Sequence, residues 1–192
     1  MKKNRLTKGN YGYFKQKRKD EILKTILMFA VSLSLFFAGY NVTGQKANVL
    51  TVVAVLGMLP SSKSAVSMIM YLKYHGCGSE LFRKLSESVG QFEHVLHAYD
   101  LVFTTYKVNY EVPSVVVKGG NVCGICQRKN CDLNELNKHI SQLLTQNGLK
   151  ANVKVFDNLD TYIKRVKQLE VLEMTEETKD KEIMHILHQI SL

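Results

Sequence analysis

Residues 22–40 read ILKTILMFAVSLSLFFAGY and carry one charged side chain, Lys24, close to the start of the stretch. Ten of these side chains are Leu, Ile, Phe or Val, among them Ile22, Phe29 and Phe36. At about 1.5 Å of rise per residue, a helix of this length covers roughly 28 Å, close to the hydrocarbon thickness of a bilayer. The stretch therefore predicts a membrane-spanning helix over residues 22–40.

A second apolar stretch, residues 47–60, follows after a short polar turn at residues 41–46, NVTGQK. It includes Val49, Val55 and Leu59. Extending it further would place Lys63 inside the membrane at a cost of about 2.5 to 3.5 kcal/mol if central. Because proline donates no amide hydrogen bond, we expect this helix to end near Pro60 and a new one to start after it. The two stretches together predict a two-span membrane hairpin.

Two alternatives to a membrane hairpin, a cleavable signal peptide and a buried helical hairpin, share parts of this apolar pattern. A cleavable signal peptide has a basic start and an apolar centre, but its centre is usually about 7–15 residues long and ends in a small-residue cleavage site. The residues Gly39-Tyr40-Asn41 make a poor cleavage site. A buried helical hairpin of a soluble domain would suit the shorter second stretch, whereas the length of the first stretch favours a membrane span.

Basic residues are concentrated before the first span. The first 24 residues hold nine Lys or Arg and two acidic residues, in a chain of net charge +9. Such a flank stays on the cytoplasmic side of a membrane, so we expect residues 1–21 to be a cytoplasmic tail and both termini to be cytoplasmic. Tyr11, Tyr13 and Phe14 in this tail suit a membrane interface. The expected partners are the lipid bilayer and anionic lipid headgroups, and nucleic acid is not expected.

Residues 61–77 have the spacing of a connecting helix. Ala65, Met68, Ile69 and Leu72 recur on one face, with Lys63 and Ser64 turned away. This face could lie on the membrane surface, or it could pack on the following domain.

Residues 78–192 predict one α/β (α+β) cytoplasmic domain. The pattern gives a helix from residue 79 to about 96, and then strand spacing over 102–112 and on both sides of Gly119-Gly120. A helix with the capping pair Asp132 and Glu135 follows, then a strand at 151–156 and helical spacing at 159–166 and 183–190. The order is helix, strand, strand, strand, helix, strand, with further helices at the end.

This order, over residues 79–169, resembles the αβββαβ core of the restriction-endonuclease-like nucleases. The resemblance implies a metal site made by one carboxylate and, on a neighbouring strand, by an acidic residue, one intervening residue and a lysine. Asp100 could supply the first carboxylate. Glu111, however, is followed by Val112 and Pro113, and Lys118 is seven residues away, so the second motif is absent as written.

Cys123, Cys126 and Cys131, followed by His139, supply three thiolates and an imidazole, which is a full tetrahedral ligand set for zinc. Only one C-x-x-C pair is present, so two other readings stay open: chemically idle cysteines in a reducing cytoplasm, or a redox pair. His94 and His97, and also His185 and His188, have the spacing of one helical turn and could each ligate a metal ion. No cofactor other than zinc is suggested.

The chain has none of the glycine-rich phosphate-binding, zinc-protease or nucleophile-elbow motifs. The sequence therefore favours a membrane-tethered cytoplasmic binding or scaffold module with an unknown ligand. The alternative is a membrane-anchored nuclease-like or metal-dependent enzyme, and the sequence leaves enzymatic activity open.

Overall fold

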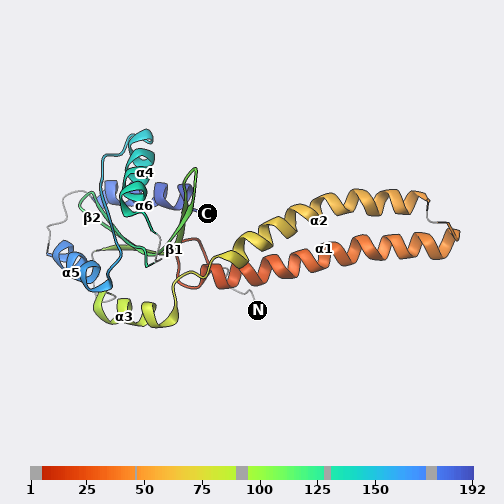
Figure 1. Cartoon of the computed structure of the whole chain (residues 1–192), viewed down its shortest axis with the longest axis horizontal. Coiled ribbons are helices and arrows are strands. Elements are labelled where there is room, and N and C mark those ends of the chain that lie inside the picture. Colours follow the sequence, from red (N-terminus) through yellow and green to blue (C-terminus); the bar gives the residue numbers. More distant parts are fainter. Residues whose placement is uncertain (1–5, 46, 90–94, 128–130, 172–176) are drawn as a thin grey trace. The chain divides into compact units, whose positions relative to one another are not determined.

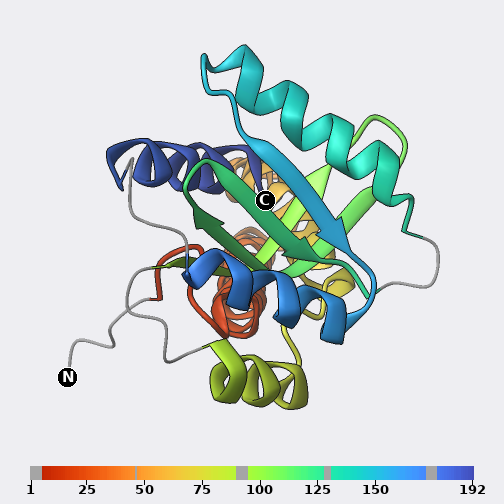
Figure 2. The same ribbon diagram turned by 90° about the vertical axis from the view of Figure 1, so that its left-hand side faces the viewer.

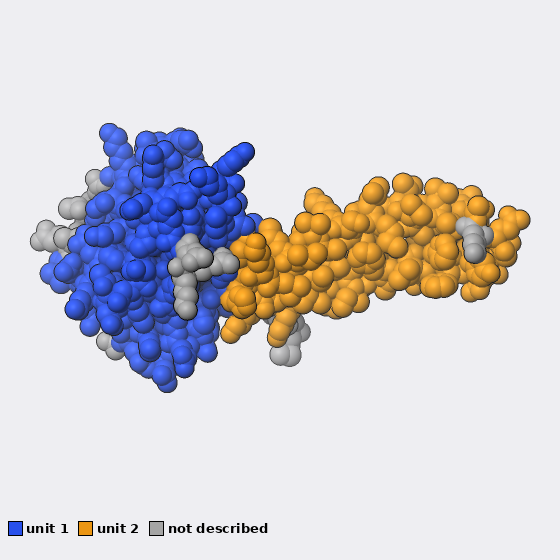
Figure 3. Space-filling model, viewed as in Figure 1, with its two compact units in different colours: residues 1–13, 76–192 blue, residues 14–75 orange. Residues whose placement is uncertain are grey.

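The computed structural model describes residues 6–45, 47–89, 95–127, 131–171 and 177–192. The chain forms two compact units, shown in different colours in Figure 3. One unit is a pair of helices, residues 14–75. The other combines the residues up to Tyr13 with residues 76–192, so the segment before the helices belongs to the same unit as the chain after them.

The helical unit consists of α1 (Tyr13–Thr43) and α2 (Val49–Lys73), both long and apolar enough to cross a membrane (Figure 1). This agrees with the predicted pair of apolar helices. α1 starts nine residues before the predicted span because much of the basic tail is helical. Arg18 in this first part donates hydrogen bonds to the carbonyls of Tyr71 (3.3 Å) and Tyr74 (2.5 Å), which satisfies the C-terminal end of α2.

The predicted break at Pro60 is wrong, since α2 runs through the proline to Lys73. Ser61 donates its hydroxyl to the carbonyl of Gly57 (2.9 Å), and Ser62 does the same to Met58 (2.9 Å). Pro60 removes the amide that would donate to the carbonyl of Leu56, and the helix continues with that one bond missing. Residues 61–73 are therefore the second half of α2, and no separate connecting helix starts after the proline.

The helices pack through small residues. The residues that α1 and α2 bury are mostly small or hydroxylated, and those that they expose are mostly apolar. A Cβ atom at Gly57 would lie 2.8 Å from Oγ of Ser32 and 3.8 Å from its Cβ, so the helices approach closely here and a side chain at position 57 would displace the Ser32 hydroxyl. In residues 64–72, Ser64 is buried whereas Ile69 and Leu72 are exposed, so these two apolar side chains do not pack on the following domain, and their place at a membrane surface stays a prediction.

The second unit is a mixed α/β fold, as predicted. Its described helices and strands are α3 (Ser79–Val89), β1 (Leu96–Thr104), β2 (Asn109–Lys118), β3 (Asn121–Ile125), α4 (Leu133–Gln146), β4 (Asn152–Phe156), α5 (Leu159–Glu170) and α6 (Glu177–Ile190). The strands lie in the order β1-β2-β3-β4. β2 is antiparallel to both β1 and β3, and β4 is parallel to β3. Helices α4 and α6 cover one face of the sheet, and α3 and α5 cover the other (Figure 2).

The first two strands differ from the prediction. The single alternating run at 102–112 is divided by a turn at residues 105–108, and Leu96 begins β1 instead of ending a helix. Thr105 forms the turn, because its amide donates to the carbonyl of Val108 (2.9 Å) and its hydroxyl accepts from the amide of Val108 (3.1 Å). The hairpin at Gly119-Gly120 is confirmed, with φ angles of 58° and 70°.

Both edges of the sheet are covered. At β1, the amide of Tyr99 donates to the carbonyl of Gly9 (2.7 Å), and the amide of Leu192 donates to Val102 (2.9 Å). At β4, Oδ1 of Asn137 on α4 accepts from the amide of Val155 (2.7 Å). Covered edges prevent pairing with other chains.

Candidate functional site

The nuclease-like residues have structural roles in this fold. Asp100 is buried, and its carboxylate accepts hydrogen bonds from the amides of Cys77 (2.5 Å) and Gly12 (3.1 Å). It faces Pro113 across the β1–β2 pair, so Lys118 lies five residues further along β2, about 17 Å away. Lys118 donates to the carbonyl of Glu170 at the end of α5 (2.7 Å). The geometry therefore does not bring Asp100 and Lys118 into one site.

The nuclease motif of an acidic residue, one intervening residue and a lysine is also absent when Lys118 is taken as its lysine. The residue two positions before it is Val116, which is fully buried against α5. Glu111 pairs with Val102 in the β1–β2 register, on the far side of Pro113 from Lys118. The acidic residue that the nuclease pattern requires beside its lysine is thus replaced by a core side chain.

The four predicted zinc ligands are divided between the two sheet faces. Cys123 lies in the core beneath α3 and α5, whereas Cys126 lies in the core beneath α4 and α6 with Cys131 packed against it. His139 is half-buried on α4. Alternation along β3 and the residue after it causes the division, since positions 123 and 126 have opposite parity. Within the described ranges, no three His, Cys, Asp or Glu side chains gather as metal ligands.

The histidine pairs have different outcomes. His94 lies outside the described residues, and His97 is in strand β1 rather than on a helix. His185 and His188 are both in α6, as their spacing predicts. Burial lowers the pKa of His188, and the neighbouring Lys8 and His185 lower it further. Burial also lowers the pKa of His97, so both side chains favour the neutral form.

Of the aromatic residues of the tail, Phe14 is buried, and Tyr11 and Tyr13 are half-buried. The ring of Tyr11 stacks on Phe82, with centroids 3.7 Å apart, and meets the edge of Tyr99. Phe14 is 1% exposed and packs on Tyr71 in the helical unit. Tyr11 thus packs within the α/β unit, and Phe14 packs within the helical unit, so the boundary between the units falls between these two residues.

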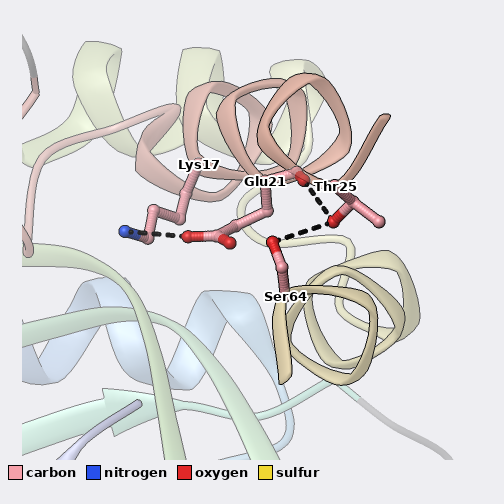
Figure 4. A network of polar contacts seen from close by, with 4 residues as sticks. All are labelled: Lys17, Glu21, Thr25 and Ser64. Atoms are coloured by element: carbon pink, nitrogen blue, oxygen red, sulfur yellow. Dashed lines mark hydrogen bonds and ion pairs between the residues drawn. The ribbon is translucent and has the colours of Figure 1, made fainter. Parts of the chain in front are cut away.

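A buried polar network lies between α1 and α2 (Figure 4). Thr25 donates its hydroxyl to the carbonyl of Glu21 (2.7 Å) and shares a hydrogen bond with the hydroxyl of Ser64 (3.1 Å). Lys17 lies 3.4 Å from Oε1 of Glu21. The other carboxylate oxygen, Oε2, is buried and has no hydrogen-bond partner among the residues that the structure describes. The network joins the helices through polar contacts at the start of the apolar segment.

A basic hollow lies between β4 and α5, with a volume of about 560 Å³. We define the basic hollow by its lining residues, which are Asn152, Lys154, Phe156, Thr161, Lys164, Arg165 and Gln168. The strand residues alternate with period two, and the helix residues recur at three- and four-residue spacing, so each set lies on one face of its element. The lining contains three cations and no carboxylate.

Sequence reasoning missed this hollow, although both periodicities are visible in the sequence. The helical spacing predicted at residues 159–166 is confirmed, and Tyr162 and Val166 lie on the buried face of α5. The polar positions next to them were not connected with the polar face of residues 152–156. Only the packing of α5 against β3 and β4 brings the two polar faces together.

Comparisons of the chain with models of known protein families, with curated proteins and with solved structures give no match.

Proposed function

We propose that the chain is a two-span membrane protein that holds its α/β unit at the cytoplasmic face as a tethered binding or scaffold module. The observation that carries the anchor is the distribution of side chains on α1 and α2. Leu23, Val49 and Leu59 are 68%, 79% and 69% exposed, whereas Thr25 and Ser61 are buried. A helical pair in water would bury its apolar residues, and a pair in lipid packs through small and hydroxylated ones.

The charge distribution supports the orientation. The basic residues before the first span outweigh the single Lys46 of the short turn, which lies outside the described residues. Arginine and lysine next to a span favour the cytoplasmic side, and an even number of spans returns the chain to the same side. The α/β unit would then share the cytoplasm with the N-terminal segment.

A pair of reporter fusions tests this topology. We expect a reporter that is active only outside the cytoplasm to be silent when fused after Leu192. The same reporter fused after Gln45, where only the first helix has been made, should be active and serves as the matched control. Activity after Leu192 at the level of the control would contradict the hairpin.

The alternative, a metal-dependent nuclease, is disfavoured by the separation of Asp100 from Lys118 and by the use of both Asp100 oxygens for backbone amides. We expect the full chain in detergent to leave DNA and RNA intact with Mg²⁺ or Mn²⁺. Cleavage that disappears in Asp100→Asn would establish the alternative instead.

A further inference from the structure

We infer that the basic hollow binds the phosphate groups of a soluble polyanion. This inference rests on the proposed function of a binding module and names the ligand class of that module. The first support is uncompensated charge. Lys154, Lys164 and Arg165 all line the hollow, and no carboxylate of the described residues lies within ion-pair distance of them. Three such cations repel one another unless an anion lies between them.

The second support is that two of the cations are held in place. Arg165 is half-buried, donates to Oε1 of Gln168 (3.2 Å) and also contacts the thiol of Cys123 beneath it. Nζ of Lys154 lies 5.5 Å from the centroid of the Phe156 ring. A planar guanidinium that is already oriented loses little freedom when it binds phosphate. The hollow therefore presents a half-buried guanidinium and an ammonium group over an aromatic ring, in addition to the exposed Lys164.

The neutral residues of the hollow complete a set of hydrogen-bonding groups. Asn152 lies at one end of β4, and Thr161 and Gln168 lie one turn before and one turn after the two cations of α5. Amide and hydroxyl groups can donate to phosphate oxygens that the cations leave unbound. The volume of about 560 Å³ is in the range of small-ligand sites, which is roughly 300–1,000 Å³.

The hollow lacks a surface for a nucleobase. Its one aromatic side chain, Phe156, is 8% exposed and packs against Tyr162, and the ammonium group of Lys154 lies over its ring. Stacking of a base requires an open aromatic face. We therefore expect recognition through phosphate groups, so that inorganic tripolyphosphate and ATP bind with similar affinity.

The test uses the full chain in dodecyl maltoside, a detergent without phosphate, and titrates inorganic tripolyphosphate by calorimetry at physiological ionic strength, about 0.15 M. We expect binding by the wild type and a loss of at least about tenfold in affinity for the double variant Lys154→Gln/Lys164→Gln. Both side chains are exposed, so the variant keeps the fold. The double variant Lys154→Arg/Lys164→Arg should retain binding.

The matched control is Lys150→Gln/Lys167→Gln, which removes two exposed cations from the same part of the chain without touching the lining. It should bind within about twofold of the wild type, because the effect of total charge alone is screened by salt. No binding by the wild type, or an equal loss in the control, would overturn the site. An affinity for ATP more than about tenfold above that for tripolyphosphate would overturn recognition by phosphate alone.

A second arm distinguishes a soluble ligand from a lipid headgroup. Phosphatidic acid is added to the micelles, and its displacement of tripolyphosphate is measured. No displacement supports the soluble polyanion, and full displacement at equal concentration overturns the soluble source. The reporter fusions do not depend on this assay, so a failure of the anchor and a failure of the hollow give separate results.

Discussion

At the scale of single residues, Asp100 is the residue whose role differs most from its prediction. It adopts a left-handed backbone conformation, with φ of 55°, in the middle of β1. In that conformation its carboxylate reaches the amides of Gly12 and Cys77, which come from segments far apart in sequence. Asp100, which could have supplied one carboxylate of a nuclease-like metal site, accepts hydrogen bonds from two segments of backbone in this fold.

We expect Asp100→Ala to destabilise the α/β unit, because each buried amide that loses its acceptor costs about 1–3 kcal/mol. Hydrogen exchange should rise in the peptides that contain Gly12 and Cys77, measured by mass spectrometry on the full chain. Asp100→Asn keeps one acceptor oxygen and tolerates a positive φ angle, so its effect should be smaller. Unchanged exchange in Asp100→Ala would contradict this role.

Tyr110 gives the unit a dependence on alkaline pH. Burial, and then the hydrogen bond to Oε2 of Glu135 (3.0 Å), raise the pKa of Tyr110 to about 12. In the unfolded chain the phenol ionises near pH 10, so between about pH 10 and 12 the folded state holds the proton that the unfolded state has lost. The free energy of unfolding should therefore fall as the pH rises through this window.

The measurement is denaturant unfolding of the full chain in detergent across this pH range. Tyr110→Phe should show a weaker decrease than the wild type, because it removes the titrating group and keeps the ring. An equal decrease in both chains would assign the effect to other groups, of which Tyr162 is the first candidate, since burial raises its pKa as well.

At the scale of helices and strands, Gly57 and Ser32 mark a close approach of α1 and α2. We expect Gly57→Leu to lower the temperature at which the detergent-solubilised chain loses its monodisperse elution, because the added side chain overlaps Ser32. Overpacking of this kind costs typically about 1–3 kcal/mol. Val55→Leu adds bulk at a position 62% exposed and should have no effect. Equal behaviour of the two variants would show that the helices are not packed through Gly57.

The sequence predicts correctly those helices and strands that begin or end at a recognisable cap or turn residue. Asp132 caps α4 as expected, since its carboxylate accepts from the amides of Asn134 and Glu135, and Gly119-Gly120 forms the expected hairpin. The turn at residues 105–108 was missed because it has no glycine, proline or asparagine, and the alternation continues through it. The break predicted at Pro60 is wrong because the loss of one amide hydrogen bond, to the carbonyl of Leu56, does not end this helix.

The site depends on contacts between elements, which local patterns do not contain. Cys123 and Cys126 are an odd number of residues apart, so strand alternation alone places them on opposite faces of the sheet. That placement argues against one metal ion bound by both. The basic hollow required the position of α5 on the sheet. The role of Lys118 required the end of α5 to lie beside the end of β2, and no local pattern indicates that.

At the scale of the whole molecule, the α/β unit is discontinuous in sequence. Residues 78–192 were predicted to form the domain alone, but the segment before the helices also belongs to it. Gly9 has φ of 90°, and a Cβ atom there would lie 2.3 Å from Nε2 of His188. Lys8 donates to the carbonyl of Ser191. The N-terminal segment is thus fitted to β1 and α6.

We therefore expect a fragment of residues 76–192 to be less stable than the same fragment with residues 1–13 joined to it through a flexible linker. The segment covers the edge of β1 and supplies the ring that stacks on Phe82. Thermal unfolding by circular dichroism measures the difference. Gly9→Ala in the linked fragment should remove most of the gain, and a gain that survives this change would contradict a specific fit.

The discontinuity of the α/β unit also sets an order of events during synthesis. Residues 6–13 leave the ribosome before the two apolar helices, and their partners Phe82, Tyr99 and Asp100 leave after them. Domains generally fold as units once their chain is available. The two apolar helices are therefore complete while the sheet is still incomplete. With the proposed membrane anchor, the hairpin would enter the bilayer first and the sheet would fold afterwards, when the N-terminal segment meets the newly made β1.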